Sequence, residues 1–172
     1  METQEILTLA SDITRSWDWV TETWQPEPNR LDARLRSPDD LLPLVAALRV
    51  KRLGYLAAIT GLDLGPEAGE IEVLYHFCVR SAVITLRVHL PREGARVPTL
   101  SEIIPSAEAF ERELSEMFGI KVNGLRTPEH LYLPDDWPET AYPLRKDFDP
   151  GILPSPATAT YEERTNGNRS AA

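Results

Sequence analysis

The first third of the chain alternates between helical and strand-like spacing of its hydrophobic residues. Residues 3–13 place apolar side chains three and four positions apart, which is the spacing of one buried helix face. Residues 17–24 and 31–35 look extended, and in the second segment leucine and alanine alternate with charged residues, as in a strand with one buried face. A turn at 25–29 separates them, because its prolines cannot donate to a strand ladder. The chain is therefore predicted to begin as helix, strand, strand.

A second helix is predicted to end at about Leu53, and its start has two alternatives. Ser37 followed by Pro38 resembles a cap and a first-turn proline, but Pro43 would then interrupt the second turn. With Asp40 as the cap, Pro43 takes the third position, where its missing amide costs nothing. Asp40 is therefore the preferred start.

The end of this second helix is basic. Arg49, Lys51 and Arg52 lie in its last turn, where cations complement the helix dipole, and Gly54 offers a left-handed stop. The segment 55–62 that follows is apolar on both faces, which predicts a strand in the centre of a sheet.

The clearest local pattern is a hairpin around Arg80 and Ser81. The predicted inward face consists of Ile71, Val73, Tyr75, Phe77 and Val79 on the first strand and Ala82, Ile84, Leu86 and Val88 on the second. Burying one large side chain contributes ~1.5–3 kcal/mol. A slip by one residue would expose the whole set, so the register is strongly fixed.

A third helix is predicted over 107–118, with Ser106 as its cap and Gly119 as its left-handed end. Its inward stripe is Phe110, Leu114, Met117 and Phe118, and its other faces carry Glu108, Glu111, Glu113 and Glu116. Such carboxylates suit acid–base catalysis or metal binding. The di-iron motif, however, requires His three residues after Glu, and Glu113 is followed there by Glu116. We interpret the helix as acidic and either solvated or facing a partner.

The pattern changes beyond Gly119. Seven of the fifteen prolines fall in the last 52 residues, and no apolar periodicity remains there. From the residues alone, this segment is either a disordered tail or an extended arm that becomes ordered against another protein. The predicted fold class is α+β: a mixed or antiparallel sheet with helices packed on it over 1–118, an extended proline-rich docking arm over 119–156, and a weakly ordered tail over 157–172.

Composition narrows the classes of function. A formal net charge of -9 argues against nucleic acid or an anionic membrane surface as the main partner. It fits a docking surface for basic partners, and a solvated acidic exterior with no partner is the simpler alternative.

Cys78 is the only cysteine, so the chain cannot fully ligate an iron–sulfur cluster. The place of Cys78 in a strand pattern predicts a small buried side chain. His76, His89 and His130 have no ligand spacing. No nucleotide-binding loop or nucleophile elbow is present, and we predict no catalytic, cofactor or metal site. With no apolar run near ~20 residues and no signal-like start, the chain is expected to be cytoplasmic.

Two short motifs in the arm can act as anchors. Asp135-Asp136-Trp137 and Arg145-Lys146-Asp147-Phe148 combine aromatic rings with charged side chains. Trp and Arg dominate interaction hot spots, because they concentrate rigid area and paired hydrogen bonds. From the residues alone, a role within the fold and a role at an interface are equally acceptable.

The order of these motifs resembles a known family. Glu111-Arg112-Glu113 followed by Met117-Phe118-Gly119-Ile120, then Leu133-Pro134-Asp135-Asp136-Trp137, then Pro143-Leu144-Arg145-Lys146-Asp147-Phe148, is similar to the 30 kDa subunit of the proton-pumping NADH–quinone oxidoreductase known as complex I. The same family occurs in energy-converting membrane-bound [NiFe] hydrogenases. Two features depart from the complex I form: Gly124 is followed by Leu125 and Arg126 in place of His-Pro, and the link from Trp137 to Pro143 is long, as in the hydrogenase branch.

This resemblance implies a non-catalytic subunit that is peripheral on the cytoplasmic side of the cell membrane. Its implied partners are the large 49 kDa-like or hydrogenase large subunit and the iron–sulfur subunits, which would hold the clusters and the quinone or [NiFe] site. The implied partner-interface residues are Glu111, Arg112, Glu113, Asp135, Asp136, Trp137, Arg145, Lys146, Asp147 and Phe148. Contact with the membrane would come only through the complex, and the ion-pumping steps would lie in other chains.

Two rival interpretations remain. A free-standing acidic module would bind a basic partner transiently and with strong salt sensitivity. An independent enzyme using the glutamates would bind a metal stoichiometrically.

Overall fold

The structure is a computed structural model that describes residues 2–127 and 129–153. Its elements are α1 (Thr3–Arg15), β1 (Val20–Glu27), β2 (Arg30–Leu35), the 3-10 turn η1 (Pro38–Asp40), α2 (Leu41–Val50), β3 (Tyr55–Gly65), β4 (Glu70–Val79), β5 (Ala82–Pro91), β6 (Arg96–Pro98), α3 (Ala107–Phe118), β7 (Lys121–Asn123) and the 3-10 turn η2 (Pro150–Ile152). The predicted tail, 157–172, and the last residues of the predicted arm lie outside the described residues.

A five-stranded mixed sheet forms the centre of the fold, in the order β1-β2-β5-β4-β3. Strands β2 and β5 run parallel, and the other neighbours are antiparallel. A small parallel pair, β6 and β7, forms a second sheet. This arrangement confirms the α+β prediction.

The hairpin has the predicted register. Val79 pairs with Ala82 and Phe77 with Ile84, so the two apolar rows share one face. Tyr75 and Phe77 are almost completely buried. Local alternation was sufficient here, because both strands and their turn are consecutive in sequence.

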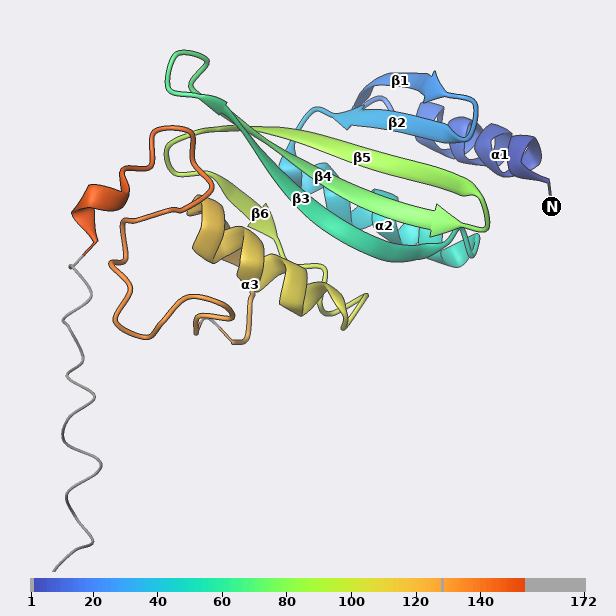
Figure 1. The fold of residues 1–172 in the computed structure, drawn as a ribbon. Coiled ribbons are helices and arrows are strands. Elements are labelled where there is room, and N and C mark those ends of the chain that lie inside the picture. Colours follow the sequence, from blue (N-terminus) through green and yellow to red (C-terminus); the bar gives the residue numbers. More distant parts are fainter. Residues whose placement is uncertain (1, 128, 154–172) are drawn as a thin grey trace, which may run out of the picture.

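Helix α3 packs on β3, on the face of the sheet that carries these apolar rows (Figure 1). The contact is close at Gly61, where an added Cβ would lie 2.5 Å from the ring of Phe118. Gly61 pairs with the buried Val73, which places this approach over the hydrophobic core. The predicted bounds of α3 are correct, and Gly119 ends the helix with φ of 70°.

Two local predictions are wrong. Strand β3 was expected in the centre of the sheet, but it lies at an edge, where α3 packs on one of its faces. Gly54 has the predicted positive φ, of 89°, but the left-handed residue that ends α2 lies two positions earlier, at Arg52, with φ of 54°. At the start of α2, Ser37 caps the preceding turn η1 through its hydroxyl, whereas the Asp40 side chain bonds back to the Ser37 N–H.

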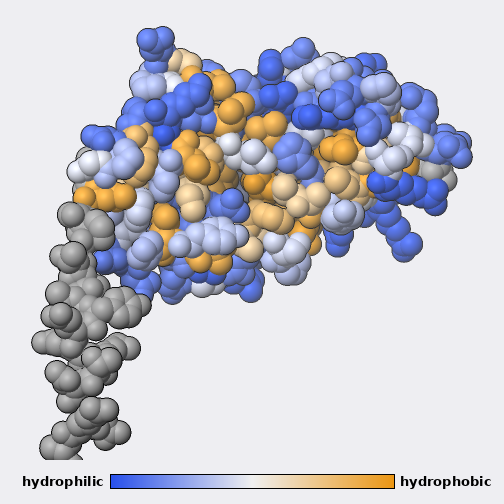
Figure 2. All heavy atoms as spheres, viewed as in Figure 1, coloured by the Kyte–Doolittle hydropathy of each residue, from blue (hydrophilic) through white to orange (hydrophobic). Residues whose placement is uncertain are grey.

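The core extends beyond the predicted limit of residue 118. Ile120 and Val122 are buried, and β7 pairs with β6. The sequence analysis did not predict β7, because its three residues show no apolar periodicity and the strand is stabilised by its pairing with the distant β6. Residues 124–127 and 129–153 then return along α3 toward the turn between β3 and β4 (Figure 1). In Figure 2, hydrophobic residues reach the surface mainly over the middle of the molecule and its arm-bearing half, whereas the end that carries α1 is mostly hydrophilic.

Candidate interaction site formed by the arm and helix α3

A buried charge cluster attaches the arm to the sheet. Asp63, at the end of β3, accepts hydrogen bonds from Arg92 Nε at 3.0 Å and Nη2 at 3.2 Å. The backbone N–H of Lys146 donates to the same carboxylate at 2.8 Å, and Arg92 also contacts Asp147. The Asp63 carboxylate therefore binds both the Arg92 guanidinium and the backbone of the arm.

The electrostatics of Asp63 follow from these contacts. Burial raises its pKa, but the hydrogen bond from Arg92 and the N–H groups of Lys146 and Gly65 oppose that effect. The net pKa is about 2, compared with 3.8 for an unperturbed carboxyl. Asp63 is therefore ionised throughout the neutral range, as a fixed partner for Arg92.

Arg145 joins the arm to the end of α3. Its Nε donates to the Phe118 carbonyl oxygen at 2.9 Å, and its Nη2 donates to the Arg92 carbonyl oxygen at 3.1 Å. The guanidinium also lies 4.7 Å from the ring centre of Tyr142. A cation at the carbonyl end of a helix is favourable for the helix dipole.

Aromatic packing closes the arm on itself. Trp137 Nε1 donates to the Ala141 carbonyl oxygen at 2.7 Å, and the Trp137 and Phe148 rings stack with centroids 6.2 Å apart. Ala141 is buried beneath this loop. The Trp137 and Phe148 side chains are themselves only half-buried.

Two glutamates of α3 are buried, contrary to the interpretation of a solvated or partner-facing acidic helix. Glu111 is 1% exposed, and it accepts hydrogen bonds from Thr99 Oγ1 at 2.6 Å and from the Leu100 N–H. Burial raises its pKa, and these two bonds only partly oppose the rise. The carboxylate thus fixes the loop that precedes α3.

The other buried glutamate fixes a segment in the first half of the arm. Glu116, 7% exposed, accepts from the backbone N–H groups of Leu131 at 2.8 Å and Tyr132 at 3.0 Å. From the same helix, Arg112 Nη2 donates to the carbonyl oxygens of Glu129 at 3.0 Å and His130 at 2.8 Å. An acceptor and a donor on α3 therefore hold one short segment of the arm backbone.

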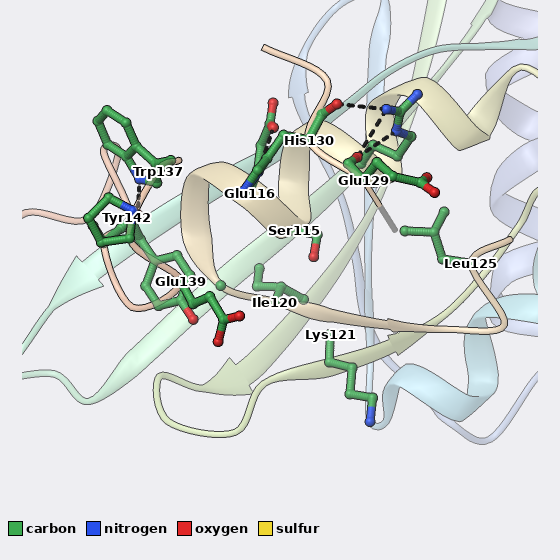
Figure 3. A pocket seen from close by; sticks show the side chains of 14 residues that line it. Ser115, Glu116, Ile120, Lys121, Leu125, Glu129, His130, Trp137, Glu139 and Tyr142 are labelled. Carbon is green, nitrogen blue, oxygen red and sulfur yellow. Dashed lines mark hydrogen bonds and ion pairs between the residues drawn. The ribbon is translucent and has the colours of Figure 1, made fainter. Parts of the chain in front are cut away.

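A hollow of about 400 Å³ lies between α3 and the arm. In Figure 3 its rim carries Glu116 and His130 from one side and Trp137 and Tyr142 from the other. Its lining mixes acidic, basic and aromatic side chains, and the charged groups nearest α3 already bind arm backbone. This arrangement suits protein contacts better than chemistry on a small molecule.

The predicted interface residues divide into two groups. Within the chain, Glu111, Arg112, Trp137, Arg145 and Asp147 are engaged by the contacts above, together with Phe148. Glu113 is half-buried, and Asp135, Asp136 and Lys146 are exposed. Lys146 Nζ lies 3.3 Å from the Leu64 carbonyl oxygen, and the side chains of the other three make no hydrogen bond or ion pair to another described residue.

Sequence reasoning missed Asp63 and Arg92, and it named Glu116 only as one of the carboxylates on the surface of the helix. Their partners are far away in the chain, so no spacing rule links them. It also missed two outward-facing apolar residues of the arm, Tyr132 at 65% and Leu144 at 53% exposure. Leu144 lies inside the motif at 143–148. A large apolar residue in a proline-rich segment was the signal that could have indicated an exposed anchor there.

A second buried ionic cluster lies on the sheet. Arg87 donates to Glu72 at 2.6 and 2.7 Å and to Asp32 at 3.1 Å, and the Arg87 guanidinium lies 5.4 Å from the Trp24 ring centre. Burial raises the pKa of Glu72, but its bonds to Arg87 reverse the effect, so the net pKa is lowered. The cluster satisfies its own charges and offers no open ligand position.

Two further observations concern the described residues only. They contain no group of three or more His, Cys, Asp or Glu side chains placed to hold a metal ion. None of their helices has the length and apolar character needed to cross a bilayer. Cys78, expected to be buried, is half-buried next to a turn.

Comparison with known proteins shows that this chain is similar to members of one family. Residues 34–151 match the family described as respiratory-chain NADH dehydrogenase, 30 Kd subunit. The chain is 37% identical over 113 residues to an NADH-quinone oxidoreductase subunit of Moorella thermoacetica, covering 64% of this chain and 74% of that protein. It is 35% identical over 125 residues to formate hydrogenlyase subunit 5 of Escherichia coli, covering 69% of this chain but only 22% of that protein.

Solved structures agree with these relatives. A chain of the membrane-bound sulfane sulfur reductase, an archaeal respiratory membrane complex, matches with a TM-score of 0.68 and 28% identity over 86% of each chain. A trypsin-resistant fragment of Nqo5 matches with a TM-score of 0.57 and 22% identity, covering 74% of this chain and 99% of the fragment, which supports the fold.

Proposed function

Because the chain belongs to the family of the 30 kDa subunit of respiratory-chain NADH dehydrogenase, we propose that it is a non-catalytic peripheral subunit of a complex I-like NADH- or ferredoxin–quinone oxidoreductase. In this role it holds the large subunit that carries the quinone site. Electron transfer and the coupled ion pumping belong to other chains of the assembly. On this proposal the chain lies on the cytoplasmic side of the membrane and reaches it only through its partners.

The observation that carries this proposal is the outward face of the arm. Tyr132 and Leu144 are exposed, although the backbone of both residues is fixed by α3: Glu116 binds the Tyr132 N–H, and the Leu144 N–H donates to the Met117 carbonyl oxygen at 3.1 Å. Large apolar side chains held at fixed positions are typical of interface anchors. The exposed Asp135 and Asp136, between them in sequence, supply the polar rim.

The remaining predicted residues take a supporting role in this proposal. Trp137, Arg145, Asp147 and Phe148 shape the arm from within, and the surface that they present is the one that meets the large subunit. We expect no cofactor in this chain, since a scaffold requires none. Iron–sulfur clusters, and the quinone or [NiFe] site, are proposed to lie in partner subunits.

One observation supports a second candidate within the same family. The match to formate hydrogenlyase subunit 5 covers more of this chain than the match to the Moorella protein. The chain would then be the equivalent subunit of a membrane-bound [NiFe] hydrogenase. The large subunit that co-purifies with it decides between the two: two Cys-x-x-Cys pairs indicate hydrogenase, and their absence indicates quinone chemistry.

A double variant tests the docking surface. Tyr132→Ser with Leu144→Ser changes only exposed side chains, so the isolated chain should keep its melting temperature. The affinity of the tagged variant for the large subunit should fall roughly 30- to 1,000-fold, since anchors of this kind contribute about 1–2 kcal/mol each and 1.4 kcal/mol is a factor of ten. Leu62→Ser, at an apolar residue of β3 that is 44% exposed, is the matched control and should assemble normally.

Two results would contradict the proposal. Full recovery of the large subunit with the double variant would exclude this surface. A native extract in which the chain migrates alone would exclude the scaffold and favour the free-standing acidic module.

A further inference from the structure

A basic hollow lies at the end of the molecule away from the arm. It has a volume of about 540 Å³ and is lined by Arg49, Arg52, Gly54, Tyr55, Cys78, Val79 and Arg80. These residues come from the end of α2, the start of β3 and the turn between β4 and β5, which meet at the end of the sheet opposite the arm (Figure 1).

The charge of this hollow is the reverse of the charge of the chain. The whole chain carries -9, but no Asp or Glu occurs in residues 41–62 or 73–92. No carboxylate lines the hollow, and the side chains of Arg49 and Arg52 make no hydrogen bond or ion pair to another residue that the structure describes. Lys51, also exposed, adds a fourth cation next to Arg52.

The backbone at two of these arginines is unusual. Arg52 has φ of 54° and Arg80 has φ of 52°, and among the described residues they are the non-glycine positions with positive φ. Arg52 follows α2 where the Leu53 N–H bonds to the Leu48 carbonyl oxygen at 2.9 Å, a position that usually holds glycine. Arg80 is the first residue of a two-residue hairpin turn, where glycine is again preferred. Both sites thus keep arginine at a conformational cost.

Tyr55, one of the residues that line the hollow, is 65% exposed. Val50, between Arg49 and Lys51 in sequence, is 79% exposed. Arginine, tyrosine and an exposed aliphatic side chain around a concave site are typical of protein interfaces. The guanidinium groups match carboxylates, which they can bind through paired hydrogen bonds.

We infer that this hollow, through Arg49, Arg52 and Arg80, binds an acidic segment of a second partner subunit. This contact is separate from the arm surface of the proposed function and lies at the other end of the sheet. It rests on the chain's being part of an assembly, but it does not require the arm to contact any particular subunit.

Lys51 allows a direct test in the assembled complex. Carbodiimide coupling joins a lysine to a carboxylate in contact with it, and mass spectrometry identifies both. We expect Lys51 to couple to an Asp or Glu of another subunit. We also expect Arg49, Arg52 and Arg80 to react with phenylglyoxal several-fold more slowly in the complex than in the isolated chain.

The double variant Arg52→Gly with Arg80→Gly separates binding from folding. Glycine suits both positive-φ positions, so the melting temperature of the isolated chain should not fall. The yield of the Lys51 cross-link should fall on the order of tenfold, because two of the proposed carboxylate-binding groups are gone. Arg126→Gly, which removes an exposed arginine paired with Glu102, is the control and should leave the yield unchanged.

Two results would overturn this inference. One is equal phenylglyoxal reactivity in the complex and in the isolated chain, with Lys51 uncoupled. The other is sedimentation of the isolated chain with phosphatidylglycerol vesicles, abolished in the double variant, which would assign the hollow to lipid phosphate. In both cases the chain still co-purifies with its large subunit if the proposed function is correct.

Discussion

The carboxylate of Asp63, on β3, accepts a hydrogen bond from the backbone N–H of Lys146 at 2.8 Å, and so joins the sheet to the arm across 83 residues of sequence. The same carboxylate is paired with Arg92, whose side chain is 9% exposed. The folded position of the arm therefore depends on one ion pair of the core.

Asp63→Asn should be strongly destabilising. The substitution keeps the shape of the side chain but leaves Arg92 without its buried counter-charge, and breaking such a pair costs roughly 3 kcal/mol. Urea unfolding measures the loss. Glu22→Gln removes an exposed ion pair with Arg34, and the same experiment should show less than about 1 kcal/mol. Equal losses for the two variants would contradict the structural role of Asp63.

The stability of the chain should fall in acid in a defined window. The pKa of Asp63 is about 2 in the folded chain and 3.8 in its unperturbed state, so the unfolded chain takes up the proton first. The contribution is complete above about pH 4, is lost as the pH falls toward 2, and amounts to roughly 2 kcal/mol. Unfolding free energies of wild type and Asp63→Asn should converge over this range. A difference that stayed constant down to pH 2 would contradict the assignment.

Glu111→Gln should have the opposite sign from Asp63→Asn. Burial raises the pKa of Glu111, so the folded chain holds its proton more tightly than the unfolded chain, and ionisation at neutral pH opposes folding. A glutamine can still accept from the Leu100 N–H and donate to Thr99. We expect an unfolding free energy at pH 7 equal to or above that of wild type, measured by urea titration. Glu111→Leu, which removes the acceptor, should be less stable than wild type.

Two left-handed glycines allow the packing of the arm to be measured. Gly119 has φ of 70° and Gly69 has φ of 67°, so alanine is strained at both. An added Cβ at Gly119 would lie 2.4 Å from the Tyr142 ring, whereas at Gly69 it would meet no atom within 4 Å. Gly69→Ala should cost about 1 kcal/mol, and Gly119→Ala a further 1–3 kcal/mol through overpacking against the arm. If the two costs are the same, the arm does not pack at Gly119 in solution.

Features set by neighbouring residues could be predicted from the sequence. The β4–β5 register follows from alternation on both sides of a short turn, and α3 ends at Gly119 because the chain turns left-handed there. The edge position of β3 could not be predicted, since an apolar strand covered by α3 looks the same as a central one. The burial of Glu111 and Glu116 was missed because their partners are mainly backbone N–H groups of the loops before and after α3, with the Thr99 hydroxyl at Glu111, and backbone N–H groups carry no sequence signature.

The candidate site was predicted at the level of motifs but not of roles. Trp137 and Arg145 lie in the arm as expected, yet their contacts are with Ala141 and Phe118 of the same chain. The sequence shows that these side chains can form strong contacts, but the partners of those contacts depend on the tertiary fold.

The hydrogen bonds from Glu116 and Arg112 of α3 to the arm backbone affect the rate at which a complex can form. A segment whose backbone is already immobilised loses little conformational entropy when a second protein binds to it. Capture should then proceed as one rigid-body collision, at a rate governed by diffusion and charge, without a slower phase in which a loose segment must first find its shape.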